Sequence, residues 1–152
     1  MKVVEGNLLN AFDEGIPVIA HQVNCKGKMG AGLARQIKSN HPKAFRHYKK
    51  RCDVRGSDNL GRCQLVEVRT GRYIANLFGQ DNYGGNAQQT VYRKLGEALG
   101  GLNYQCHKQG IEKVALPYGI GCGLAGGDWG VVEEIIKAKL TDVNVVLYKY
   151  DG

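Results

Sequence analysis

The chain has 152 residues, of which 43% are hydrophobic and 23% are charged, as in an ordinary globular domain. Lysine and arginine outnumber aspartate and glutamate 21 to 14, which favours anionic partners but does not distinguish nucleic acid from a phosphorylated small molecule. No apolar run approaches the roughly 20 residues of a membrane span, so we expect one soluble, cytoplasmic domain over residues 1–152.

Apolar runs with a period of two, or without interruption, predict strands, and helical patterns fall between them. The predicted strands are Met1–Glu5, Pro17–Gln22, Cys63–Arg69, Arg72–Phe78, Lys113–Tyr118 and Val143–Tyr148. The predicted helices are Ala31–Asn40, Ala44–Val54, Gln88–Gln109 and Asp128–Leu140. We expect Asp128 to cap the last helix, Pro42 to separate the first two, and Thr70-Gly71 to turn a hairpin. This order indicates an α/β sandwich around a mixed sheet.

Two glycine-rich loops each join a predicted strand to the next helix. The first is NCKGKMGAGLA, from Asn24 to Ala34, and the second begins with GIGCGLAGG at Gly119. In α/β folds, ligands bind where loops run from the carboxyl ends of strands into helix N-termini. Small side chains let the backbone approach a phosphate closely, so we predict that the loops hold one diphosphate from opposite sides. The alternative is that these glycines only make tight turns.

The second loop contains Gly121-Cys-Gly123-Leu-Ala-Gly126, which matches the G-x-G-x-x-G pattern of dinucleotide-binding folds. Those folds need an acidic residue at the end of the second strand of a βαβ unit. Asp142 stands at about the right distance but precedes the predicted strand Val143–Tyr148, so we interpret the match as accidental. A Walker pattern, G-x-x-x-x-G-K-[ST], is absent from the sequence.

Four stretches, in this order, resemble the motifs of macro domains. They are Gly6-Asn7-Leu8-Leu9, then Ala20-His21-Gln22-Val23-Asn24-Cys25 with Met29-Gly30-Ala31-Gly32-Leu33-Ala34, then Asn76-Leu77-Phe78, and Pro117-Tyr118-Gly119-Ile120-Gly121-Cys122-Gly123-Leu124. The chain most resembles the branch that holds yeast-type ADP-ribose-1''-phosphate phosphatases, the terminal ADP-ribose protein glycohydrolase and the antitoxins of DNA ADP-ribosylating toxins. The resemblance covers nearly the whole chain and implies a three-layer α/β/α sandwich with ADP-ribose in a cleft.

The resemblance also assigns contacts to ADP-ribose. We expect no cofactor, and the residues of the sequence require no metal. The residues by the adenine would be Gly6, Asn7 and Leu8. Those by the distal ribose and one face of the diphosphate would be Gln22, Val23, Asn24, Met29, Gly30, Ala31, Gly32, Leu33 and Ala34. Those by the other face would be Gly119, Ile120, Gly121, Cys122, Gly123, Leu124 and Ala125, and Phe78 is a further expected contact. Asn7 stands where many macro domains carry an aspartate that accepts a hydrogen bond from the adenine amino group, and its amide oxygen can accept the same bond.

His21 and Asp81 are the candidate catalytic residues. The phosphatases that this sequence resembles place a histidine at the point of His21, near the distal ribose, where it would be a general acid or base. The alternative for His21 is a half-buried structural side chain, and for Asp81 a solvated loop carboxylate. We expect Asn24 to face the distal ribose hydroxyls, although turn formation is the common role of such an asparagine. Asp128 is interpreted as a helix cap rather than a catalyst.

Two catalytic positions of the terminal ADP-ribose protein glycohydrolase have no counterpart here. Its lysine would follow the strand Arg72–Phe78, where this chain has Gly79-Gln80-Asp81, and its aspartate would stand at Ala125. A lysine-linked covalent intermediate is therefore not expected. Cys25 and Cys122 are interpreted as small fillers of the loops, and all five cysteines as reduced thiols.

We therefore expect a hydrolase that acts on an ADP-ribose derivative at the distal ribose, with ADP-ribose-1''-phosphate as the first candidate substrate. One alternative is a non-catalytic reader of ADP-ribose or of ADP-ribosylated macromolecules. Another is an antitoxin-like hydrolase of ADP-ribosylated nucleic acid or protein, for which the basic run Arg46–Arg51 would supply phosphate contacts. We interpret that run as a solvated helix face, so nucleic acid stays an open alternative rather than the expected partner.

Overall fold

The computed structural model describes residues 1–150 and contains one six-stranded sheet, in the order β1-β6-β5-β2-β4-β3. The strands are β1 (Lys2–Glu5), β2 (Val18–Val23), β3 (Cys63–Arg69), β4 (Arg72–Phe78), β5 (Lys113–Pro117) and β6 (Asn144–Lys149). Only β3 runs antiparallel to its neighbour, so the sheet is mixed as predicted. The carboxyl ends of β2, β4 and β5 therefore meet at one edge of the sheet.

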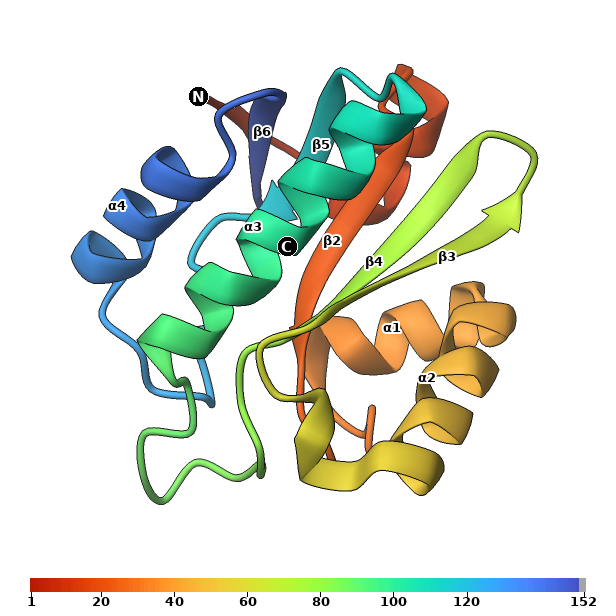
Figure 1. The fold of residues 1–152 in the computed structure, drawn as a ribbon. Coiled ribbons are helices and arrows are strands. Elements are labelled where there is room, and N and C mark those ends of the chain that lie inside the picture. The colour runs from red at the N-terminus through yellow and green to blue at the C-terminus, as the bar shows by residue number, and fades with distance from the viewer. Residues whose placement is uncertain (151–152) are drawn as a thin grey trace.

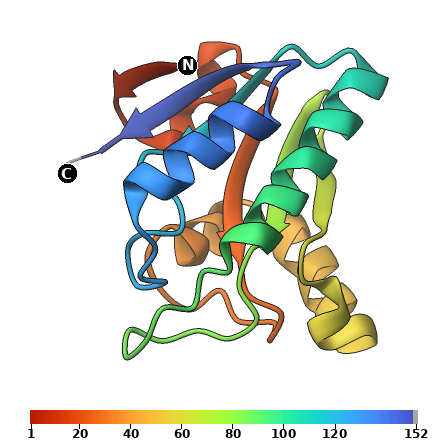
Figure 2. The same ribbon diagram turned by 60° about the vertical axis from the view of Figure 1, so that its left-hand side comes forward.

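Helices cover both faces of this sheet, which confirms the three-layer α/β/α sandwich. They are α1 (Gly32–Asn40), α2 (Pro42–Arg55), α3 (Tyr92–Gln109) and α4 (Trp129–Lys139). Figures 1 and 2 show α3 and α4 side by side on one face, with α1 and α2 on the other. Three short 3-10 helices, which the sequence patterns did not predict, complete the structure at η1 (Leu8–Asn10), η2 (Phe12–Glu14) and η3 (Gly56–Asn59).

The central strand β2 is buried on both faces, which explains its nearly continuous apolar sequence. Val18 and Ala20 pack in the cluster below α3 and α4. Ile19 points to the opposite face and packs with residues of α1 and of the 3-10 helices. Because β2 is enclosed in this way, the loop that follows it is held between two packed layers.

The largest boundary difference from the sequence prediction lies before α3, which begins at Tyr92 rather than Gln88. Thr90 instead forms an isolated antiparallel bridge with Gln80. The other predicted elements agree within two residues, and Asp128 caps α4 as predicted, accepting a hydrogen bond from the Val131 N–H at 3.2 Å. No helix within residues 1–150 is both long enough and apolar enough to cross a membrane.

Candidate functional site

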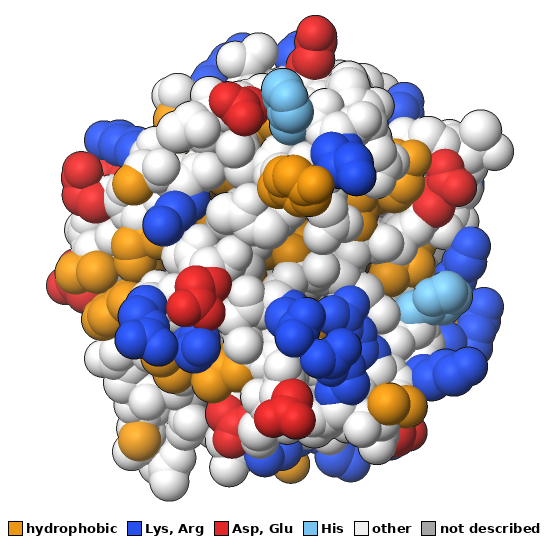
Figure 3. Space-filling view, in the orientation of Figure 1, with side chains coloured by type: hydrophobic (Ala, Val, Ile, Leu, Met, Phe, Trp, Pro, Cys, Tyr) orange, Lys and Arg blue, Asp and Glu red, His pale blue; other side chains and the backbone are white. Residues whose placement is uncertain are grey.

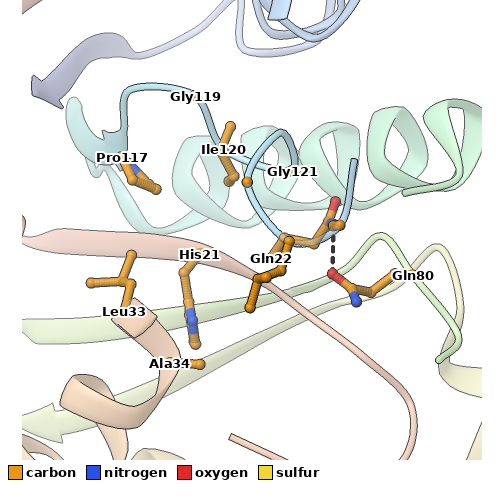
Figure 4. A pocket seen from close by; sticks show the side chains of 12 residues that line it. His21, Gln22, Leu33, Ala34, Gln80, Pro117, Gly119, Ile120 and Gly121 are labelled. Carbon is orange, nitrogen blue, oxygen red and sulfur yellow. Dashed lines mark hydrogen bonds between the residues drawn. The ribbon is translucent and has the colours of Figure 1, made fainter. Parts of the chain in front are cut away.

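Two adjoining cavities of about 220 and 640 Å³ form a cleft at the carboxyl ends of β2 and β5. Both glycine loops contribute to its walls. Figure 4 shows Leu33 and Ala34 of α1 on one side of the smaller cavity, and Gly119, Ile120 and Gly121 on the other. The prediction that the two loops face each other across one site is therefore consistent with the geometry.

Asn24 holds the first glycine loop in shape. Its Oδ1 accepts a hydrogen bond from the Lys26 N–H, and its Nδ2 donates one to the Lys28 carbonyl oxygen, both at 2.9 Å. The hydroxyl of Tyr48 in α2 donates toward the main-chain oxygen and Oδ1 of Asn24, each at 2.8 Å. Tyr48 is fully buried, and burial raises the pKa of its hydroxyl far above the ordinary value, so it stays a donor. Asn24 thus has the turn role, and it also lines the larger cavity.

The first loop delivers the N-terminus of α1 to the cleft. Ala31 occupies the N-cap position and makes no side-chain capping hydrogen bond. Gly32 has a φ of +56°, in the left-handed region that favours glycine, and Gly30 to Ala34 line the larger cavity. Uncapped N–H groups and the positive end of the helix dipole at this wall favour a bound anion.

The second loop is fixed around Gly121 and open at Gly123. Gly121 has a φ of +77°, and its carbonyl oxygen accepts hydrogen bonds from the Thr90 hydroxyl at 2.6 Å and the Gly127 N–H at 2.9 Å. A Cβ added at Gly123 would meet no atom within 4 Å, and Gly123 lines both cavities. A side chain placed there would therefore enter the cleft without disturbing the loop.

A polar chain ties the second loop to the middle of the sheet. The Gln22 Nε2 donates to Gln80 Oε1 at 2.7 Å, as Figure 4 shows, and lies 2.9 Å from the Thr90 hydroxyl that in turn holds Gly121. The Gln22 Oε1 is buried without a partner among the described residues. A Cβ at Gly79 would collide with this side chain, so the glycine after β4 makes room for Gln22.

His21 is a buried and neutral side chain that lines the smaller cavity. It is 2% exposed, and its Nε2 lies 2.7 Å from Asn76 Oδ1. The Asn76 Nδ2 donates a hydrogen bond to Gln64 Oε1, so the Asn76 Oδ1 faces His21 as an acceptor. The His21 Nε2 is therefore the protonated ring nitrogen. Nδ1 is buried and has no partner within residues 1–150. Burial lowers the pKa of His21 to about 4, although the hydrogen bond to Asn76 opposes this, so His21 is a weak base near pH 7.

Asp81 does not line either cavity. One of its carboxylate oxygens accepts a hydrogen bond from the Ser57 hydroxyl, and the other lies 3.4 Å from Lys26 Nζ. Its main-chain oxygen accepts a hydrogen bond from the Cys25 N–H at 2.9 Å, which joins the segment after β4 to the first loop. Of the two candidate catalytic residues, only His21 lies at the cleft.

Most of the predicted site residues line one cavity or both. These are His21, Gln22, Val23, Asn24, Gly30, Ala31, Gly32, Leu33, Ala34, Gly119, Ile120, Gly121, Gly123, Leu124 and Ala125. The predicted residues that line neither are Gly6, Asn7, Leu8, Met29, Phe78, Cys122 and Asp81. Asn7 caps η1 by accepting a hydrogen bond from the Leu9 N–H, and Met29 and Phe78 pack in the core beside Tyr48. The adenine contacts stay a prediction.

Five lining residues were missed by the sequence analysis: Lys28, Gln80, Tyr83, Gly84 and Pro117. Most lie in irregular loops, where no periodic pattern marks a residue. Lys28 is the only formally charged side chain in the walls, and no carboxylate of residues 1–150 lines either cavity. This balance of charge also favours an anionic ligand.

The site shows no activated thiol. Burial, followed by the charge of Asp81, raises the pKa of Cys25 to about 12, and burial also raises the pKa of Cys122. Within the described chain, no group of three His, Cys, Asp or Glu side chains is placed to hold a metal ion.

The model of the macro domain family matches residues 20–136 of this chain. The chain is 33% identical over 155 residues to the DNA ADP-ribosyl glycohydrolase of Mycobacterium tuberculosis, covering 97% of this chain and 41% of that protein. It is 25% identical over 175 residues to the ADP-ribose 1''-phosphate phosphatase of Saccharomyces cerevisiae, covering 96% of each. Among solved structures, the macrodomain of M. tuberculosis DarG has a TM-score of 0.81 at 29% identity, over 97% of this chain and 95% of that one. The chain thus spans less than half the length of the mycobacterial glycohydrolase.

Proposed function

We propose, because this chain belongs to the macro domain family, that it binds ADP-ribose in the cleft and hydrolyses an ADP-ribose derivative at the distal ribose. The observation that carries the proposal is the pair of glycine loops on opposite walls of one cleft. The first turn of α1 and the backbone around Gly123 would supply N–H donors to the two phosphates. The absence of carboxylates from the walls within residues 1–150 supports the same ligand, since a diphosphate would be repelled by them.

The distal ribose would lie in the larger cavity, beside Asn24, Lys28 and Tyr83. The Asn24 amide donates one hydrogen to the Lys28 carbonyl oxygen and has no second acceptor among residues 1–150. Its remaining N–H would donate to a ribose hydroxyl, so the turn role and the ribose contact are compatible. Tyr83 is 51% exposed at this cavity, which leaves space for a group attached to the ribose.

Two leaving groups fit this cavity. Phosphate, from ADP-ribose-1''-phosphate, is our first candidate, and it is supported by the yeast phosphatase, which aligns with this chain over 96% of both lengths. The positive charge of Lys28 would favour this extra phosphate. A DNA base is the second candidate, supported by the mycobacterial relative and by the exposed ring of Tyr83, on which a base would stack.

We keep His21 and Asp81 as the proposed acid–base pair. In this role Asp81 would have to leave Ser57 and Lys26 to reach the cleft, and the free Nδ1 of His21 would accept the proton. His21→Ala and Asp81→Ala should then each lower turnover by roughly 10²-fold, the usual scale of positioned acid–base catalysis. The affinity for ADP-ribose should change far less. Wild-type turnover in both variants would remove the pair from the mechanism.

The experiment that tests the function compares substrates under single-turnover conditions. ADP-ribose-1''-phosphate, O-acetyl-ADP-ribose, ADP-ribosylated protein and ADP-ribosylated single-stranded DNA are each incubated with excess protein, and release of the group on the distal ribose is followed. We expect the fastest release from ADP-ribose-1''-phosphate. Faster release from DNA would favour the second leaving group, and tight binding of ADP-ribose without release from any substrate would make the protein a reader.

A further inference from the structure

A second feature of the molecule lies outside the cleft, where basic side chains from α2 and from the start of β3 gather on one face. We call it the α2–β3 basic surface and define it as Arg46, Lys50, Arg51, Arg55 and Arg62. Figure 3 shows Lys and Arg side chains gathered on the face over α2 and the start of β3. None of the five forms an ion pair within residues 1–150, whereas the neighbouring Lys49 pairs with Asp53.

The fold brings like charges together on this surface. Arg46 and Lys50 are four residues apart on α2, as are Arg51 and Arg55, and like charges at this spacing repel each other. The fold then adds Arg62, which is held beside β4 because its carbonyl oxygen accepts the Phe78 N–H at 3.0 Å. Burial, and then the charges of Arg55 and Arg62, lower the pKa of Arg51. A bound anion would offset this repulsion between positive charges, so the surface favours anion binding.

Two of the arginines are oriented for an external acceptor. Arg51 Nε donates to Asn59 Oδ1 at 2.9 Å, and Arg62 Nε donates to the Asp58 carbonyl oxygen at 3.3 Å. Their terminal guanidinium nitrogens have no hydrogen-bond acceptor in the described chain. Guanidinium groups fixed through Nε keep two parallel donors free, which is the geometry that binds a phosphate through two oxygens.

The surface is shallow and open. Two cavities of about 540 Å³ each lie along it, and they share Arg51 and Gln64. Neither is lined by a carboxylate of residues 1–150, and their other lining side chains include the amides of Gln64 and Gln105, the imidazole of His47 and the exposed Val54. Successive anionic groups along an extended chain fit this shape better than one small anion does.

We infer that the α2–β3 basic surface binds the phosphate backbone of a single-stranded nucleic acid. Four arginines and a lysine at spaced positions match a repeating phosphate, and the amide and apolar side chains between them suit sugars and bases. The surface goes beyond the proposed function, because binding of an unmodified strand needs no ADP-ribose. The surface lies at the same end of the sheet as the cleft. The Arg62 carbonyl oxygen accepts a hydrogen bond from Phe78, the last residue of β4, and Gln80, two residues later, lines the cleft.

The test uses fluorescence anisotropy with a short, labelled, unmodified oligothymidylate over a range of salt concentrations. The variant Arg46→Ala/Lys50→Ala/Arg55→Ala removes three exposed charges of the surface. The matched control, Lys108→Ala/Lys113→Ala/Lys137→Ala, removes three exposed charges elsewhere and leaves the same net charge. We expect the first variant to bind about tenfold or more weakly, with its log K against log [salt] slope smaller by about 2, since each lost single-strand phosphate contact contributes about 0.7.

If the two triple variants lose the same affinity for the oligonucleotide, the inference is overturned, because the net positive charge of the protein then explains the binding without a particular surface. Equally tight binding of duplex DNA would overturn the preference for a single strand. If the first variant does not fold, Arg55→Gln/Arg62→Gln replaces it. Calorimetric binding of ADP-ribose to the same variants separates the two proposals, because it should stay at the wild-type level even where the strand no longer binds.

Discussion

The Tyr48 hydroxyl offers a sharp test of how the first glycine loop is held. Tyr48→Phe removes only the hydroxyl group that donates to Asn24 and keeps the ring, which stacks on Phe78 with ring centroids 5.8 Å apart. The single hydroxyl hydrogen that the two Asn24 oxygens share is then lost. Oδ1 keeps the Lys26 N–H, and the buried main-chain oxygen keeps only a weak contact with Cys52 Sγ at 4.0 Å. An unsatisfied buried acceptor costs about 1–3 kcal/mol, so we expect a loss of about 2 kcal/mol.

For a chain of this length, that loss should lower the melting temperature by about 4–8 °C. Thermal unfolding followed by circular dichroism measures it, and Tyr104→Phe is the matched control because Tyr104 is 62% exposed. The affinity for ADP-ribose should fall too, since Asn24 is less firmly placed at the cleft. A melting temperature for Tyr48→Phe within 1 °C or so of the Tyr104→Phe value would refute the assigned role.

Two further substitutions test the rest of the site. Thr90→Val keeps the shape of the side chain but removes the hydroxyl that links Gln22 to the Gly121 carbonyl oxygen. Chemical denaturation should show that the free energy of unfolding falls by about 1–2 kcal/mol, and calorimetry should show a weaker affinity for ADP-ribose. Unchanged values in both measurements would contradict the role of Thr90 in this chain of hydrogen bonds. Burial lowers the pKa of His21 from 6.5 to about 4. Between these two pH values the unfolded chain binds more protons than the folded chain does, so the free energy of unfolding decreases as the pH falls, by about 3 kcal/mol in total. His21→Gln should flatten this fall, and an identical pH profile of unfolding would show that His21 is not buried as a neutral side chain.

The sequence predicted the layers of the fold well because local patterns determine them. The enclosed strand β2 is nearly all apolar, and Asp128 begins α4 as a local capping signal predicts. The start of α3 was predicted too early because Thr90, in a segment of helix-compatible composition, pairs with Gln80 instead. Thr90 is also held by the Gln22 side chain and by the Gly121 carbonyl oxygen, 68 and 31 positions away, and no local pattern records these contacts.

The two glycine loops were predicted from their order between strand and helix, but the residues that hold them were not. Tyr48 reaches Asn24 across 24 positions, and Thr90 reaches Gln22 across 68. The basic run Arg46–Arg51 was interpreted as a solvated helix face, and Arg46 and Lys50 are exposed as that interpretation expects. Tyr48 in the same run is fully buried, which the run of charges did not indicate. Arg62 completes the α2–β3 basic surface because Asn59 contacts both Arg51 and the Arg62 N–H.

Calorimetric titration of ADP-ribose into three proteins tests the central claim most directly: the wild type, Gly123→Glu and Gly100→Glu. A Cβ at either glycine would meet no atom within 4 Å, so both variants should fold, but only Gly123 lines the cleft. The diphosphate between the loops should be repelled by a carboxylate at residue 123, so we predict binding to the wild type and Gly100→Glu and none to Gly123→Glu. Wild-type affinity in Gly123→Glu, or no binding by the wild type, would contradict the account.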